Sequence, residues 1–242
     1  METMPDAAAV APWLARLGAR AMGCSAGCRG ATVVLLLPGG ERHSSATHPD
    51  LAALATLQEE TGEGPGAEAT RSGLLVCAAD LVTDARWPHF RVAALERGLR
   101  ACAAVPAVAE GVGTTVTLYA FRPWRLAPEA SEAVRVLAEE TAVGLLHDHA
   151  RADAEAEAAQ LRTAMASRAV IDQAIGIVMH MLDCDADHAF GVLRTLSQRT
   201  NRKLSAVAAR IVRVKGRGST RDLRRLLDEV RGEGLRGVSQ LF

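Results

Sequence analysis

The stretch Ala31-Thr-Val-Val-Leu-Leu-Leu-Pro-Gly-Gly40 predicts a β-strand that ends in a tight turn. Seven residues that are apolar or β-branched favour a buried strand. Pro38, Gly39 and Gly40 then give a strong turn signal. Residues 42–48 follow as a second strand, so the sequence predicts an antiparallel hairpin at this point.

Further strand and helix signals lie on either side of the hairpin. Residues 114–121 alternate polar and apolar side chains, as an antiparallel strand does. The other predicted elements are two strands, 74–81 and 101–107, and two helices, 10–22 and 50–59. Asp50 is the expected N-cap of the second helix. Strands joined by hairpins and flanked by helices are typical of an α+β fold.

A long helical segment is predicted after the sheet. No proline interrupts residues 129–181, and Gly144 and Gly176 are the only glycines there. Leu161 and Met165 form an i, i+4 apolar pair. The segment predicts one or two long helices, which we expect to pair with a second chain in a homodimer.

Three shorter amphipathic patterns follow, at residues 171–182, 189–196 and 204–211. Asp185 and Asn201 are the expected N-caps of the second and third helices, and Phe190 is assigned to the core. Short helices with one apolar face bury that face against one another, so an all-α three-helix bundle is predicted.

Composition argues against several classes of protein. Residues 1–6 are acidic and lack an apolar signal sequence, and no stretch approaches the about 18 apolar residues of a membrane span. We therefore expect a soluble, cytoplasmic protein without membrane contact. No phosphate-binding loop, nucleophile motif or metal-ligand cluster occurs, so the chain is expected to be no enzyme and to have no catalytic residue, metal or cofactor.

The five cysteines are an odd number and mostly scattered, which argues against a disulfide framework. Buried free thiols are the main expectation. Cys24 and Cys28 form a lone C-x3-C pair, which leaves a redox or metal site open as an alternative.

Charge is distributed unevenly along a chain of zero net charge. Residues 1–150 hold 12 basic and 17 acidic side chains, whereas residues 213–242 hold 8 basic and 4 acidic ones. Such asymmetry suggests a polyanionic partner near the C-terminal end, although a solvated basic surface explains it equally well.

Three segments of the first half resemble the GAF sensor domains of actinobacterial regulators. They are Glu60-Thr-Gly-Glu-Gly-Pro65, Asp84-Ala-Arg-Trp-Pro88 and Val105-Pro106. The resemblance covers about residues 8–148 and implies a pocket over an antiparallel sheet.

Trp87, Glu63 and Pro65 are the pocket residues that this resemblance implies. The glycines around Pro65 allow close approach of the backbone, and Trp87 offers an apolar wall with one N–H donor. A small ligand of unknown identity is one expectation. The alternative is a pocket that has lost its ligand in a domain that serves dimerisation.

The second half resembles the ANTAR domain of transcription antitermination regulators over about residues 155–213. The matching motifs are Ile171-Asp-Gln-Ala-Ile-Gly-Ile-Val-Met179, Ala189-Phe190, Leu193-Arg-Thr-Leu-Ser-Gln198 and Asn201-Arg-Lys-Leu204. Many members have Lys where Ile175 stands, which puts in doubt an RNA contact there. The resemblance implies binding to hairpin loops of a nascent RNA, which prevents a terminator stem from forming.

The predicted organisation is a GAF sensor domain at 8–148, an ANTAR domain with its connecting helix at 149–213, and a basic amphipathic helical tail at 214–242. The predicted RNA-binding residues are Arg194, Gln198, Arg199, Asn201, Arg202, Lys203, Arg210 and Gln173. Arginine and amide contacts are expected in place of an aromatic stacking surface. Ser197 is open between backbone bonding and RNA contact, and Gly176 between helix packing and close approach of RNA.

Two hypotheses about the function are consistent with the sequence. The first is a signal-responsive, RNA-binding antitermination regulator in which the GAF domain controls the ANTAR domain. The second is a small-molecule or redox sensor whose helical half is a dimerisation or protein-interaction module.

Overall fold

The computed structural model describes residues 4–216, with side chains up to Arg213. It divides into two compact units, one up to Asp153 and one from Ala154. These are called the N-terminal and C-terminal units below. The predicted boundary lay after residue 148. The predicted tail at 214–242 lies outside the described residues, apart from the end of the last helix.

The N-terminal unit is built on a five-stranded antiparallel sheet of order β2-β1-β5-β4-β3. The strands are β1 Gly30–Leu36, β2 Arg42–Ala46, β3 Val76–Ala78, β4 Ala101–Ala109 and β5 Val112–Ala120. The predicted hairpin is present, since Leu36 pairs with Arg42 and the Leu37 N–H donates to Glu41 at 2.9 Å. The α+β prediction is confirmed.

Strand β3 is shorter than the predicted strand 74–81. Gly73 ends the preceding helix in a left-handed conformation with φ 69°, and the Leu74 N–H donates to the Ser72 hydroxyl. This turn keeps Leu74 and Leu75 exposed, so the strand begins only at Val76.

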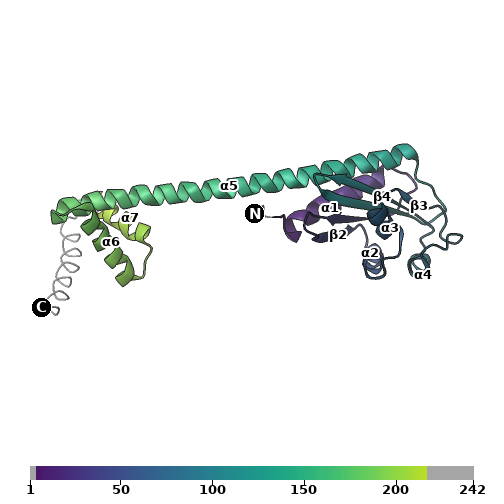
Figure 1. Ribbon diagram of the computed structural model, residues 1–242, viewed down its shortest axis with the longest axis horizontal. Coiled ribbons are helices and arrows are strands. Elements are labelled where there is room, and N and C mark those ends of the chain that lie inside the picture. The colour runs from purple at the N-terminus through teal and green to yellow at the C-terminus, as the bar shows by residue number, and fades with distance from the viewer. Residues whose placement is uncertain (1–3, 217–242) are drawn as a thin grey trace. The chain divides into compact units, whose positions relative to one another are not determined.

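Helices cover both faces of the sheet (Figure 1). They are α1 Ala7–Gly23, α2 Pro49–Thr61, α3 Pro65–Ser72, α4 Pro88–Glu96 and the first part of α5 Pro128–Leu182. Leu14 of α1 shares one core cluster with Val134 and Leu145 of α5. Leu54 of α2 and Phe90 of α4 belong to a second cluster. The sheet therefore lies between two apolar layers.

The predicted Asp50 N-cap is wrong by two residues. His48 is the N-cap of α2, with extended φ −149° and ψ 146°, and its Nδ1 accepts the Asp50 N–H at 3.2 Å. Pro49 takes the first helical position, where its missing N–H costs nothing. Asp50 lies in the first turn of α2, where the positive end of the helix dipole stabilises its carboxylate.

The C-terminal unit contains the end of α5, α6 Ala186–Thr200 and α7 Leu204–Gly216. Its core takes residues from all three helices: Ala174, Val178, Ala189, Val192, Leu193, Leu196, Val207, Ala208 and Ile211. The three-helix bundle is confirmed. The Asp185 carboxylate caps α6 by accepting the His188 N–H at 2.8 Å, as predicted.

Phe190 does not lie in the core as predicted, because its side chain is 40% exposed. Its neighbour Ala189 is fully buried and occupies the packing position. Among the described residues, no helix is long and apolar enough to cross a membrane.

Candidate functional site

The junction of α6 and α7 is a tight turn built on Asn201. This residue is the C-cap of α6, with left-handed φ 50° and ψ 40°, and its N–H donates to Gln198 at 3.3 Å. The predicted role of Asn201 as N-cap of α7 is therefore wrong. The Arg202 N–H donates to the Ser197 carbonyl at 3.1 Å, and the Ser197 hydroxyl donates to the Arg202 carbonyl at 2.6 Å. The Ser197 side chain thus bonds the backbone.

Several predicted RNA-binding residues gather at this junction. Gln198 and Arg199 lie in the last turn of α6, and Asn201, Arg202 and Lys203 form the connection to α7. All five are exposed. The first N–H groups of α7 follow directly, at the positive end of that helix. We call these five residues the basic corner.

Two further predicted residues extend the surface along the helices. Arg194 lies one turn before Gln198, on the side of α6 away from buried Leu193 and Leu196. Arg210 lies two turns after Lys203, on the same side of α7. Arg194, Arg202, Lys203 and Arg210 form no ion pair with any residue that the structure describes.

Gln173 lies apart from the basic corner, in α5, where it is exposed. Gly176 is on the same face, and a Cβ built there would meet nothing within 4 Å in the described chain. Among the residues that the structure describes, no other helix therefore packs against Gly176. Ile175 packs against the bundle core.

In the N-terminal unit, the three predicted pocket residues hold loops together. Trp87 is 5% exposed, and its Nε1 donates to the Glu68 carboxylate at 2.9 Å. The Glu63 carboxylate lies 3.1 Å from the His89 Nδ1 and accepts the His89 backbone N–H at 3.1 Å. The side-chain contact first, and then the backbone contact, lowers the pKa of Glu63. Pro65 is buried at the start of α3. These contacts tie the α2–α3 connection to the start of α4.

The glycines beside Pro65 do allow close approach, but to a side chain of this chain. Gln58 is 4% exposed, and its Oε1 accepts the Gly66 N–H at 2.8 Å. Its amide nitrogen donates to the Tyr119 hydroxyl at 3.4 Å. A Cβ at Gly64 would collide with Gln58. The backbone at Gly64 and Gly66 therefore does make a close contact, as predicted, and its partner is the buried side chain of Gln58.

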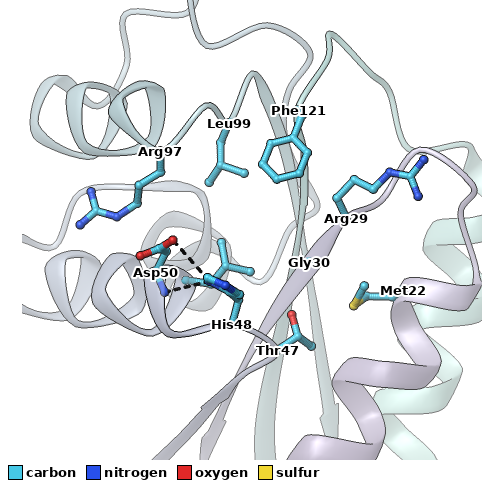
Figure 2. A pocket seen from close by; sticks show the side chains of 10 residues that line it. Met22, Arg29, Gly30, Thr47, His48, Asp50, Arg97, Leu99 and Phe121 are labelled. Carbon is cyan, nitrogen blue, oxygen red and sulfur yellow. Dashed lines mark hydrogen bonds and ion pairs between the residues drawn. The ribbon is translucent and has the colours of Figure 1, made fainter.

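A cavity of about 210 Å³ opens elsewhere in the unit, where β1 begins (Figure 2). Its apolar lining is Met22, Leu51, Leu99 and Phe121, and its polar lining is Arg29, Thr47, His48, Asp50 and Arg97. Trp87, Glu63 and Pro65 do not line this cavity. Sequence reasoning missed these residues because they come from five separate segments, and none of the segments carries a motif.

The structure shows the cysteines as free thiols, three of them affected by burial. Cys24, Cys28, Cys77, Cys102 and Cys184 are free thiols. Burial raises the pKa values of Cys28, Cys77 and Cys102. The described residues contain no group of three or more metal-ligating side chains.

Residues 159–212 match the family model described as the ANTAR domain. The match covers the end of α5, the whole of α6 and most of α7. Residues 159–212 therefore carry an ANTAR domain, which follows a separate α+β unit. No curated protein sequence matches this chain.

Solved structures resemble parts of the chain. The GAF domain of PixJ from Thermosynechococcus elongatus, in its blue-light absorbing form, is 16% identical with a TM-score of 0.43, over 60% of this chain and 90% of that one. A GAF domain/HD domain protein from Geobacter sulfurreducens is 17% identical with a TM-score of 0.43, over 56% and 91%. An RNA-binding Light-Oxygen-Voltage receptor is 23% identical with a TM-score of 0.30, over 85% and 53%. These likenesses are too distant to indicate what the N-terminal unit binds.

Proposed function

We propose that this protein is a signal-responsive regulator of transcription antitermination that binds hairpin loops in nascent RNA. The observation that carries the proposal is the basic corner with Arg194 and Arg210, because it lies within the ANTAR domain and its described side chains leave four cations without an ion pair. The protein works by binding, and no step of catalysis is part of the proposal.

The arrangement suits a structured RNA. Phosphates are held by arginine and lysine side chains and by helix N-termini, and Arg202 and Lys203 stand at the N-terminus of α7. Gln198 and Asn201 expose amides beside them, which suit hydrogen bonds to the edges of unpaired loop bases. Gln173 is assigned to the RNA surface more weakly, because it lies outside the corner.

Helix α5 supports control by the N-terminal unit. It contributes Val134 and Leu145 to the core of the N-terminal unit and Ala174 and Val178 to the core of the C-terminal unit. Because one helix belongs to both cores, we expect a change in the packing of α5 in one unit to alter its packing in the other. The signal enters the GAF-like unit, either at a pocket around Trp87, Glu63 and Pro65 or at the cavity of Figure 2.

The direct test is RNA binding by the full chain. A labelled two-hairpin RNA is titrated with the parent, with Arg202→Ala/Lys203→Ala, and with Arg71→Ala/Arg122→Ala. The last pair removes the same charge from exposed positions of the N-terminal unit. The corner variant should bind at least about tenfold more weakly, since two charge-assisted contacts are lost, while the control pair binds like the parent.

Equal loss in both double variants would show that only overall charge matters. No binding by the parent would favour the second function, a sensor whose helical half serves dimerisation or protein interaction. The raised pKa values of Cys28, Cys77 and Cys102 weigh against the redox form of that function.

A further inference from the structure

The cavity at the start of β1 has an apolar wall that the chain leaves partly uncovered. Leu51 and Leu99 are buried on one side, and Met22 of α1 lies on the other. Phe121, just after β5, lies between them and is 55% exposed (Figure 2). An aromatic ring on a cavity wall offers apolar area to a ligand, which gains when that area leaves water.

The polar side of the same cavity is positive. Arg97 donates through Nη1 to the Ala93 carbonyl at 2.8 Å, but its Nε is buried without a hydrogen-bond partner in the described chain. A buried donor without a partner is rare in folded proteins. Arg29 lines the opposite side of the cavity, with its guanidinium pointing away from Phe121 (Figure 2). Its guanidinium forms no ion pair with a described residue.

The cavity lining also contains one carboxylate, that of Asp50. Asp50 lies 3.4 Å from the Nδ1 of His48, the N-cap of α2 (Figure 2). No ion pair joins Asp50 to Arg29 or Arg97 among the described residues. The cavity thus combines an unsatisfied cationic donor with an apolar wall.

We propose that this cavity binds a small organic anion, namely a carboxylate carried on a compact aromatic or branched aliphatic body. The size of the cavity sets the class. A protein cavity of about 150 Å³ holds benzene, so the 210 Å³ here accommodates a ring with one carboxylate. The carboxylate accepts from Arg97, and the ring packs on Phe121, Leu51 and Leu99.

The proposal that the cavity binds an anion does not depend on RNA binding. The proposal that this anion is the regulatory signal rests on the proposed function. Met22 belongs to α1 and packs against the core cluster that α1 shares with α5. An occupant of the cavity therefore touches the helix that packs beside α5, which gives the anion a route to the ANTAR domain.

The test measures binding of benzoate to the full chain by calorimetry, with benzyl alcohol as the neutral counterpart. Parent and Arg71→Gln should bind benzoate alike, since Arg71 is an exposed arginine outside the cavity. Arg97→Gln should weaken benzoate binding about tenfold or more. Phe121→Ala, on the other wall, should weaken it too, and it keeps the test valid if Arg97→Gln is destabilised. Benzyl alcohol should bind more weakly than benzoate.

Two results would overturn the proposal: no saturable binding of benzoate at millimolar concentration, or equal affinity in the parent and in both cavity variants. RNA binding by Arg97→Gln without benzoate, measured in parallel, should equal that of the parent. If the parent binds RNA but not benzoate, the cavity proposal alone fails. If the parent binds benzoate but not RNA, the RNA function alone fails.

Discussion

At the scale of single residues, burial makes three of the cysteines poor nucleophiles. Burial raises the pKa values of Cys28, Cys77 and Cys102, so the reactive thiolate is scarcer at neutral pH than for a free cysteine. We expect these three to react with a thiol reagent at pH 7.5 far more slowly in the native chain than in urea. Mass spectrometry of the labelled peptides reports each site. Fast native labelling of Cys102 would revive the redox-sensor alternative.

Asn201 allows a second prediction at this scale. Its φ of 50° is left-handed, a conformation that Gly and Asn adopt readily and that costs a β-branched residue about 1–2 kcal/mol. Asn201→Val should therefore lower the free energy of unfolding of the C-terminal unit by about that amount, while Asn201→Gly stays close to the parent. Urea unfolding of the full chain, followed through helix content, measures both. A Val variant as stable as the Gly variant would contradict the assigned turn.

At the scale of helices and strands, strong local signals predict structure well, and competing ones do not. The turn at Pro38–Gly40 predicts the hairpin, which is present. The absence of proline in 129–181 predicts one or two long helices, and a single helix is found. Asn201 stands between two helices and can cap either one, so its role depends on which conformation packing selects. Phe190 lies at the edge of the buried stripe of α6, where a single residue step separates buried from exposed.

The proposed RNA surface could be predicted as a set of neighbours in sequence, because the basic corner is nearly contiguous. The cavity could not, because it forms only where the end of α1, the start of β1, the start of α2 and the residues after α4 and β5 meet. No spacing rule connects Arg29 with Arg97.

Exposed apolar residues on α5 lead to a prediction about assembly. Leu161 and Met165 are 59% and 72% exposed and lie one turn apart. We propose that they pack against the same residues of a second copy, since burying each contributes about 1.5–3 kcal/mol. Leu161→Glu/Met165→Glu should shift the full chain from dimer to monomer in sedimentation velocity. Val108→Glu, at an exposed hairpin position, is the control and should leave the mass unchanged. A parent that already sediments as a monomer would refute the dimer.

The cationic surface of α6 and α7 predicts a strong salt dependence of RNA binding. Each phosphate contact adds about 0.7–0.9 to the slope of log affinity against log salt. Arg210→Ala should therefore reduce the slope by about 1 and weaken binding to different hairpins equally. A titration of potassium chloride, with RNA anisotropy as the readout, gives the slope. An unchanged slope in Arg210→Ala would remove this residue from the RNA surface.

At the scale of the whole molecule, control of RNA binding by the N-terminal unit requires a coupling free energy between the two units, and such coupling is reciprocal. If a signal bound to the N-terminal unit changes the affinity for RNA, bound RNA must change the affinity of the N-terminal unit for the signal by the same factor. The contacts that would respond are those of α1 with α5, where the Trp13 ring packs against Gly144 and Arg20 lies 3.8 Å from Glu140. RNA binding should thus alter hydrogen exchange of amides in α1 and in residues 128–148.

Helix α5 is the element proposed to carry this coupling. Interrupting α5 should therefore leave RNA binding intact while removing the effect of RNA on the N-terminal unit. A flexible Gly/Ser insertion after Ala152 breaks the helix near the junction of the two units, at an exposed position away from both cores. The insertion variant should still bind RNA through the basic corner, but RNA should no longer change exchange in α1. If the change persists, coupling does not run through α5. If the parent shows no change either, the N-terminal unit does not control the ANTAR domain by a conformational route.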